Sequence, residues 1–131
     1  MAKKSAQSGE FMILVEDEGN IVVLQDFSNT IGAMREIAEK HEIVYDPKWT
    51  TRQFGNAIFK EYGGNEGYDN LAILGEYTVQ RFETGSFKVL RKYDNTKGAL
   101  REIAEANGFE YDKNWTTRQF GNKLVDFINS K

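Results

Sequence analysis

Two pairs of short segments carry apolar or aromatic residues at alternate positions, at 11 and 13, 21 and 23, 77 and 79, and 87 and 89. This period of two is the pattern of β-strands, and we expect these positions to face the core. These segments are rich in β-branched and aromatic residues. Each pair brackets a short turn containing Gly19 or Gly85, and glycine supplies the positive φ that a tight hairpin turn requires. The pattern therefore predicts two antiparallel hairpins, formed by residues 11–15 with 21–27 and by residues 77–82 with 87–93.

The segments after the hairpins carry apolar residues three and four positions apart, as amphipathic helices do. This spacing predicts helices over residues 29–41 and 95–107. A second helix is predicted to follow each of these, beginning after Thr50 and after Thr116, because a glutamine three residues later completes a capping box. The tryptophan before each threonine is expected to pack on the phenylalanine at the fourth position of the helix.

The start of this second helix belongs to a block that occurs twice. Residues 45–56 and 111–122 are identical at ten of twelve positions, and the alignment extends without a gap from 9/75 to the end of the chain. Matching loop lengths predict a common topology for the two copies. We expect an α+β fold in which two ββαα repeats, 9–65 and 75–131, share one core. In this fold, helices cover the antiparallel hairpins and a pseudo-twofold axis relates the repeats.

The segments outside the repeats carry weaker patterns. Residues 1–8 contain lysines without an apolar segment behind them, so we expect a disordered N-terminal tail and no secretory signal. Residues 66–74 are expected to link the repeats, since residues 63–70 are rich in turn-forming residues. Residues 71–74 are apolar, and they either lengthen the next strand or pack over the core.

Composition narrows the class of protein without identifying it. The 131 residues include no cysteine, and no apolar run approaches the roughly 18 to 20 residues that span a bilayer. We therefore expect a cytoplasmic protein that does not enter a membrane. The net charge is −3, but it is unevenly distributed, with −5 on residues 9–65 and +2 on residues 75–131. The two copies differ more in surface charge than in apolar framework.

One face of the first hairpin is unusually apolar. If the other face meets the core, the outer face of the first hairpin carries only apolar side chains, while that of the second is more polar. An exposed apolar face needs covering, either by the chain or by a second copy. The predicted partner is therefore a protein, with self-association one form of it, through Met12, Leu14, Val22 and Leu24.

The sequence offers little for catalysis or for metal binding. His41 is the only histidine, and the second copy has Asn107 at the same position. The acidic turn 16–18 lacks the ligand spacing of a calcium loop. We therefore predict no enzyme, no cofactor, no metal site and no catalytic residue. A deep pocket that joined His41, Asp46 and Arg52 would argue for an enzyme instead.

The repeated block is the candidate site. Capping, stapling and core packing explain about half of it, but a glycine inside a helix costs about 1 kcal/mol relative to alanine and both copies keep it. Arginine and tryptophan are also common in binding hot spots. The block is therefore either architecture or a recognition surface. The candidate binding residues are Trp49, Arg52, Gly55, Asn56, Trp115, Arg118, Gly121 and Asn122.

These observations favour a small binding or adaptor module with a protein partner. The alternative is a nucleic-acid-binding protein that uses the basic second repeat, in which the two helices resemble a helix-turn-helix with an overlong connection. The candidate contacts for this alternative are Lys88, Arg91, Lys92, Arg118 and Lys123.

Overall fold

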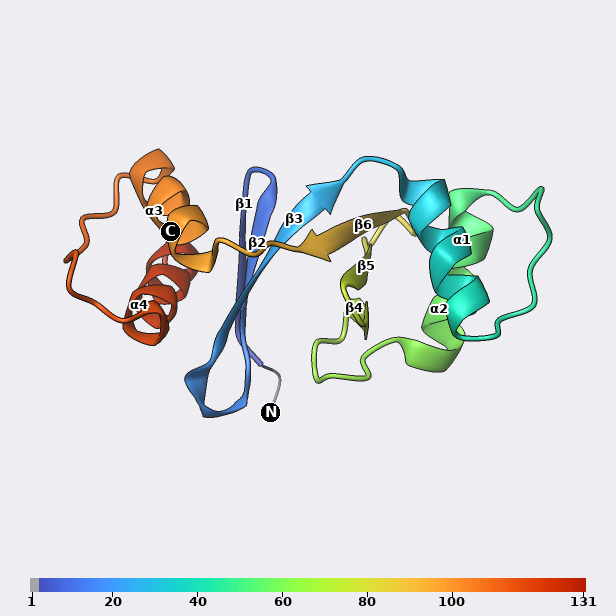
Figure 1. Ribbon diagram of the computed structural model, residues 1–131, viewed down its shortest axis with the longest axis horizontal. Helices are drawn as coiled ribbons and strands as arrows, with labels where there is room; N and C mark the ends of the chain where they lie inside the picture. Colours follow the sequence, from blue (N-terminus) through green and yellow to red (C-terminus); the bar gives the residue numbers. More distant parts are fainter. Residues whose placement is uncertain (1–2) are drawn as a thin grey trace. The chain divides into compact units, whose positions relative to one another are not determined.

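The computed structural model describes residues 3–131 and shows a mixed α+β protein (Figure 1). These residues form six β-strands and four α-helices, with one short 3-10 helix in the first hairpin turn. The described chain divides into two compact units. We call the segment Asp26–Arg91 unit 1, and the segments Lys3–Gln25 and Lys92–Lys131 together unit 2.

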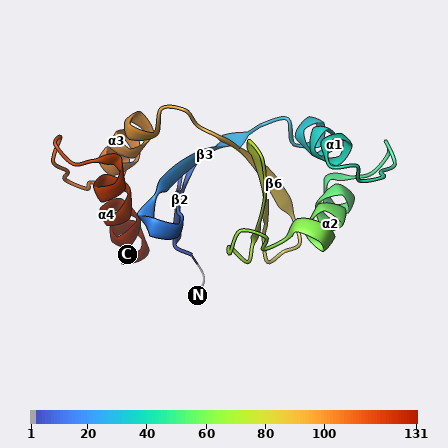
Figure 2. The ribbon, with the colours of Figure 1, turned by 60° about the horizontal axis from the view of Figure 1, so that its bottom comes forward.

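Unit 1 contains two helices and a three-stranded antiparallel sheet. Its elements are α1 (Thr30–Lys40), α2 (Thr51–Tyr62), β4 (Leu71–Leu74), β5 (Tyr77–Arg81) and most of β6 (Phe87–Lys92). Strand β5 lies between β4 and β6, with Val79 opposite Ala72 on one side and opposite Val89 on the other. The two helices lie on one side of these strands (Figures 1 and 2). At the ends of the segment, the Lys88 ammonium pairs with the Asp26 carboxylate at 2.8 Å.

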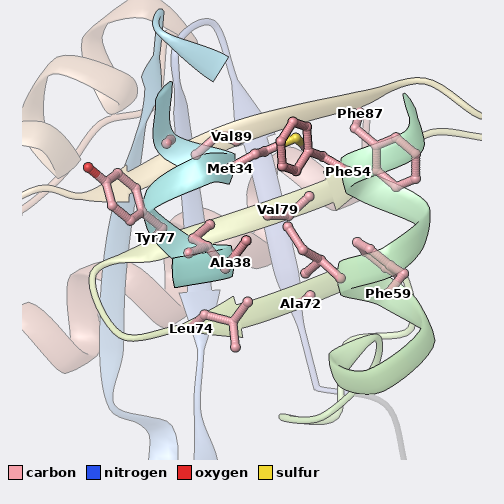
Figure 3. Close-up of a cluster of buried hydrophobic side chains, with 13 residues drawn as sticks. Met34, Ala38, Phe54, Phe59, Ala72, Leu74, Tyr77, Val79, Phe87 and Val89 are labelled. Atoms are coloured by element: carbon pink, nitrogen blue, oxygen red, sulfur yellow. The ribbon is translucent and has the colours of Figure 1, made fainter. Parts of the chain in front are cut away.

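The core of unit 1 lies between its helices and its sheet. Figure 3 shows Met34 of α1 and Phe54 of α2 directed at the strands, where they meet Val79 and Val89. Phe27 also joins this unit, with its ring edge-on to Tyr77 at a centroid distance of 5.5 Å. The alternation that marked positions 77, 79, 87 and 89 as core-facing is confirmed.

Unit 2 has the same kinds of element but is built from two separate segments of the chain. It contains β1 (Ser5–Ser8), β2 (Phe11–Val15), most of β3 (Ile21–Phe27), α3 (Thr96–Ala106) and α4 (Thr117–Asn129). Strand β2 pairs with β1 on one side and with β3 on the other. A backbone bond of 2.9 Å from the Tyr93 N–H to the Val23 carbonyl joins the two segments. The core residues of this unit include Phe11, Ile13 and Phe120.

The helices begin within one residue of the predicted positions. Asn29 and Asn95 cap α1 and α3, each accepting a hydrogen bond from the backbone N–H three residues later. Thr50 and Thr116 form complete capping boxes at the starts of α2 and α4. The predicted hairpin glycines, Gly19 and Gly85, have φ of 84° and 86°. Local residue chemistry therefore determines these helix starts and turns.

Helices α1 and α3 end differently. After α3, Gly108 has φ of 69°, the left-handed conformation in which glycine commonly ends a helix. After α1, the matching residue is Glu42, and it adopts φ of 59°. Side chains other than glycine rarely adopt this conformation, because Cβ crowds the backbone. The same stop is therefore unstrained in unit 2 and strained in unit 1.

Two segments that the sequence did not assign to the sheet are strands. The prediction of a disordered tail is wrong for residues 5–8, which form β1, while residues 1 and 2 lie outside the described residues. Within the predicted linker, residues 71–74 form β4. Backbone hydrogen bonds to β2 and β5 hold these strands, and backbone bonding needs little side-chain pattern. The sheet portion of each unit therefore has three strands.

Of the two coverings expected for the apolar face of the first hairpin, the structure shows burial within the chain. Met12, Leu14 and Leu24 are each at most 3% exposed within the chain, and Val22 is half-buried. The matching positions Thr78, Gln80 and Leu90 are buried as well. Alternation of apolar and polar residues separates two faces of a strand, but it does not show that the second face lies in water.

The helices do not cover the hairpins that precede them in the repeats. Helices α1 and α2 pack on β4, β5 and β6, which follow them in the chain. Helices α3 and α4 pack on β1, β2 and β3, from the start of the chain. The ranges 9–65 and 75–131 describe the repetition in the sequence, and for the structure they stay a prediction.

Candidate functional site

In unit 1 the repeated block packs against the β5–β6 turn. The Arg52 guanidinium lies over this turn and donates a hydrogen bond of 3.3 Å from Nη2 to the Thr84 carbonyl. One turn of helix later, Gly55 is buried beneath the ring of Phe87. A Cβ atom at Gly55 would lie 2.4 Å from two ring carbons, so this position has no room for a side chain. Close approach to Phe87 accounts for the glycine.

In unit 2 the second copy of the block makes the corresponding contacts with the β2–β3 turn. Arg118 donates from Nη2 to the Asn20 side-chain oxygen at 3.2 Å, and Asn122 donates from Nδ2 to the Gly19 carbonyl at 3.1 Å. A Cβ atom at Gly121 would lie 2.5 Å from Cγ1 of Ile21. Helix α4 therefore contacts the hairpin turn and the start of β3 through Arg118, Gly121 and Asn122.

The remaining candidate residues are partly explained. The rings of Trp49 and Trp115 pack edge-on against Phe54 and Phe120, as the staple predicts, and both tryptophans are half-buried. Asn56, unlike Asn122, is exposed. The two copies of the block belong to different units, and each has structural contacts of its own. A recognition role for these residues stays a prediction.

The basic candidates for a nucleic-acid surface are divided between the units and are partly neutralised. Lys88 and Arg91 belong to unit 1, where Lys88 pairs with Asp26 and Arg91 pairs with Glu76 at 3.2 Å. Lys92 and Lys123 belong to unit 2 with Arg118. The Lys123 ammonium lies 5.3 Å from the centroid of the Trp115 ring, a cation–π contact, whereas Lys92 is exposed.

Three tyrosines hydrogen-bond to glutamates of the preceding helices. Tyr45 donates to Glu39 at 2.6 Å, and this bond raises the pKa of Tyr45. A hydrogen bond to Glu36 raises the pKa of Tyr77. The pKa of Tyr111 is raised mainly by burial and, to a smaller extent, by a hydrogen bond to Glu105. Because the unperturbed pKa of tyrosine is about 10, all three phenols are neutral near pH 7 and act there as hydrogen-bond donors.

Two hollows on the surface of unit 1 are lined partly by polar and charged side chains. A recess of about 220 Å³ in unit 1 is lined by Glu36, Lys40, His41 and Tyr77 among others. A shallower hollow of about 370 Å³, also in unit 1, is lined by Thr30, Thr51, Arg52, Ser86 and Phe87. His41 and Arg52 line different hollows, and Asp46 lines neither of them. These two concavities therefore do not bring His41, Asp46 and Arg52 together.

Sequence reasoning missed two exposed apolar residues. Among residues 3–131, the large hydrophobic side chains that are exposed are Val44, at 91%, and Phe82, at 37%, and both lie in unit 1. The residues at the matching positions of unit 2 are Glu110 and Glu16. Comparing the copies position by position would have found this difference, because an apolar residue replaces a glutamate at both places.

Within residues 3–131, no group of three or more histidine, aspartate or glutamate side chains is placed to hold a metal ion. No helix in the same range is both long and apolar enough to cross a membrane. No family model, no curated protein and no solved structure matches the chain.

Proposed function

We propose that the protein is a non-enzymatic binding module and that unit 1 carries its surface for a protein partner. The exposure of Val44 and Phe82 carries this proposal. Val44 lies in the connection between α1 and α2, and Phe82 lies in the β5–β6 turn, where water has access to both side chains. Apolar and aromatic side chains of this kind anchor protein interfaces, because a partner removes them from water.

The apolar face of the first hairpin does not contribute to this proposed surface. Because Met12, Leu14 and Leu24 are buried within the chain, they leave no apolar patch for a second copy to cover. The protein partner is therefore expected to bind beside Val44 or Phe82.

The experiment replaces each exposed apolar residue with the glutamate that unit 2 carries at the same position. Full-length V44E and F82E are compared with the wild type in affinity capture from cells that produce the protein, with quantification of each retained protein. We expect at least one protein that binds the wild type, resists high salt and is lost with either variant. The matched controls, E110Q and E16Q, change unit 2 at the same positions and should retain it.

Two outcomes would contradict the proposal. The first is a set of bound proteins that is the same for the wild type, V44E and F82E, provided that thermal melts show all three folded. The second is retained material that disappears with nuclease and with moderate salt, since counterion release makes nucleic-acid binding strongly salt-dependent. That second result would favour the nucleic-acid alternative and would direct attention to Lys92, Arg118 and Lys123.

We also propose that the chain arose by tandem duplication of one unit and that a pseudo-twofold axis relates the copies. The matching caps at Asn29 and Asn95, the paired capping boxes, and the glycines 55 and 121 against the β6 and β3 side chains support this proposal. The strand pairs β1–β2 and β4–β5 also have the same register when 66 is added to each residue number. An experimental structure in which the two units fail to superpose would overturn it.

A further inference from the structure

The hollow beside Arg52 brings hydrogen-bond donors together from three segments of unit 1. Thr30 is the first residue of α1, Thr51 and Arg52 are the first two residues of α2, and Ser86 belongs to the turn before β6. The ring of Phe87 completes the lining. The space is about 370 Å³ and opens to solvent, so a small group can enter without any rearrangement of the backbone.

Arg52 retains most of its hydrogen-bonding capacity. A guanidinium has five N–H donors. Within residues 3–131 the structure gives Arg52 one hydrogen bond, to the Thr84 carbonyl at 3.3 Å, and gives it no ion pair. The side chain is exposed at one edge of the hollow, but its position over the β5–β6 turn limits its freedom. Less conformational entropy is lost when an already restrained arginine binds a ligand.

The hydroxyl groups add neutral donors beside this charge. Ser86 Oγ and Thr84 Oγ1 lie 2.8 Å apart and share a hydrogen bond, which restrains the Ser86 side chain. Thr30 and Thr51 are half-buried at the wall of the hollow. None of the residues that line the hollow carries a negative charge, so the lining favours an anion.

We infer that this hollow binds the phosphoryl group of a phosphate monoester. A guanidinium pairs with two oxygens of such a group in a planar fork, and the hydroxyls of Thr30, Thr51 and Ser86 are donors for the remaining oxygen. A carboxylate has only two oxygens and half the charge, so it uses fewer of these donors. The largely buried ring of Phe87 lines the same hollow.

The counterpart in unit 2 has the same arginine in a different setting. Thr96, Thr117 and Arg118 match Thr30, Thr51 and Arg52, but Asn20 and Ile21 replace Ser86 and Phe87. The Arg118 guanidinium is hydrogen-bonded to the Asn20 side chain. The adjacent turn carries the carboxylates of Glu16, Asp17 and Glu18, whereas the turn beside Arg52 carries only Glu83. These carboxylates repel an anion, so Arg118 is a natural control.

This inference goes beyond the protein-binding proposal. It concerns a different set of residues from Val44 and Phe82, and either proposal can fail while the other stands. A phosphate monoester can be a free small molecule or a phosphorylated side chain, and both present the same phosphoryl chemistry.

The test is a titration of the full 131-residue protein, labelled with ¹⁵N and followed by amide NMR at low salt. The probes are inorganic phosphate, phenyl phosphate, a short phosphoserine peptide and, as the carboxylate, acetate. We expect saturable shifts at residues 30, 51–52 and 84–87 with the phosphate probes, and much weaker binding of acetate. Phenyl phosphate and the phosphoserine peptide both carry a phosphate monoester. The one that binds more tightly shows whether the hollow prefers a small molecule or a phosphorylated side chain.

Variants assign the binding to Arg52. R52Q should weaken phosphate binding by about tenfold or more, because it removes a charge-assisted pair. R52K keeps the charge but loses the planar fork, so it should have an intermediate affinity. S86A should cost a smaller factor, and R118Q should leave the affinity unchanged. Thermal melts of each variant establish that it is folded before its affinity is compared.

Three results would overturn the assignment of a phosphoryl site to this hollow. If R118Q weakens binding as much as R52Q does, the effect is one of overall charge and the site assignment is wrong. Acetate binding as tight as phosphate binding would overturn the phosphoryl assignment. Shifts that never saturate, or that are scattered over both units, would mean only that the protein attracts anions weakly and has no site.

Discussion

Unit 1 and unit 2 contain the same kinds of element, but only one of them is continuous in the chain. Unit 1 is the single segment Asp26–Arg91, whereas unit 2 combines Lys3–Gln25 with Lys92–Lys131. In unit 1 the helices and the strands on which they pack belong to one continuous segment. In unit 2 the first hairpin must find helices that lie after all of unit 1. The comparison shows that chain order alone can make two matching arrangements unequal in stability.

The entropy of loop closure gives the size of this difference in stability between the two units. If unit 1 unfolds, its 66 residues become a flexible loop between the two halves of unit 2. Closing a loop of that length costs on the order of 4 kcal/mol, from (3/2)RT ln n. If unit 2 unfolds, unit 1 only acquires flexible tails, which cost almost nothing. Unit 2 therefore depends on unit 1 more than unit 1 depends on unit 2.

The largest expected effect comes from truncating the matched core phenylalanines. Phe54 and Phe120 are each 1% exposed, so F54A and F120A should each cost about 3 to 5 kcal/mol locally. F54A should also release unit 2, because unit 1 would then be an open loop. F120A should leave the amides of unit 1 protected. Hydrogen exchange followed by mass spectrometry resolves the protection of each unit.

Equal loss of protection in both units with both variants would contradict this asymmetry. It would mean that the two units unfold as one cooperative body whatever their order in the chain. The exposed helical variant N56A, on α2 with Phe54, controls for nonspecific effects and should change the free energy of unfolding by less than about 0.5 kcal/mol.

Much of the local structure could be predicted from the sequence, because local chemistry determines it. The capping boxes at Thr50 and Thr116 and the positive φ at Gly19 and Gly85 involve residues within a few positions of one another. Strands β1 and β4 could not be predicted as easily. Such short strands are held by backbone hydrogen bonds, which require little pattern in the side chains. Residues 5–8 show almost no apolar alternation.

The pairing of helices with hairpins could not be predicted either. The two hairpins present the same period of two and the two helix pairs present the same apolar stripe, so the pattern does not distinguish one partner from the other. The candidate site shows the same limit. Arg52 stood out because it is repeated, but Thr30 and Ser86 join it only through the tertiary fold.

The two buried helical glycines give a smaller test of the comparison. G55A places a methyl group against the ring of Phe87, which is rigid and buried, so we expect a net loss of about 1 to 2 kcal/mol after the gain in helix propensity. G121A meets Ile21, which is half-buried and can change rotamer, so it should cost less. Urea denaturation midpoints measure both, and a greater loss for G121A would refute this account of the contacts.

The smallest expected effect concerns the ends of α1 and α3. E42G should stabilise the protein by about 0.5 to 1 kcal/mol, because it removes a side chain from a residue with φ of 59°. The reciprocal variant, G108E, should destabilise it by about 1 kcal/mol. Thermal melts should show these changes as shifts of roughly 3 to 5 °C in opposite directions. Shifts of the same sign would show that the two helix ends are not equivalent.

The ion pair between Asp26 and Lys88 has a practical consequence. It joins the two ends of unit 1 at 2.8 Å, so this segment leaves the rest of the chain and returns to it at nearly the same place. A segment with adjacent ends can be grafted into a surface loop of an unrelated host without stretching that loop. Residues 26–91 therefore have the geometry of a transferable cassette, which could carry the Val44 surface and the Arg52 hollow into another protein.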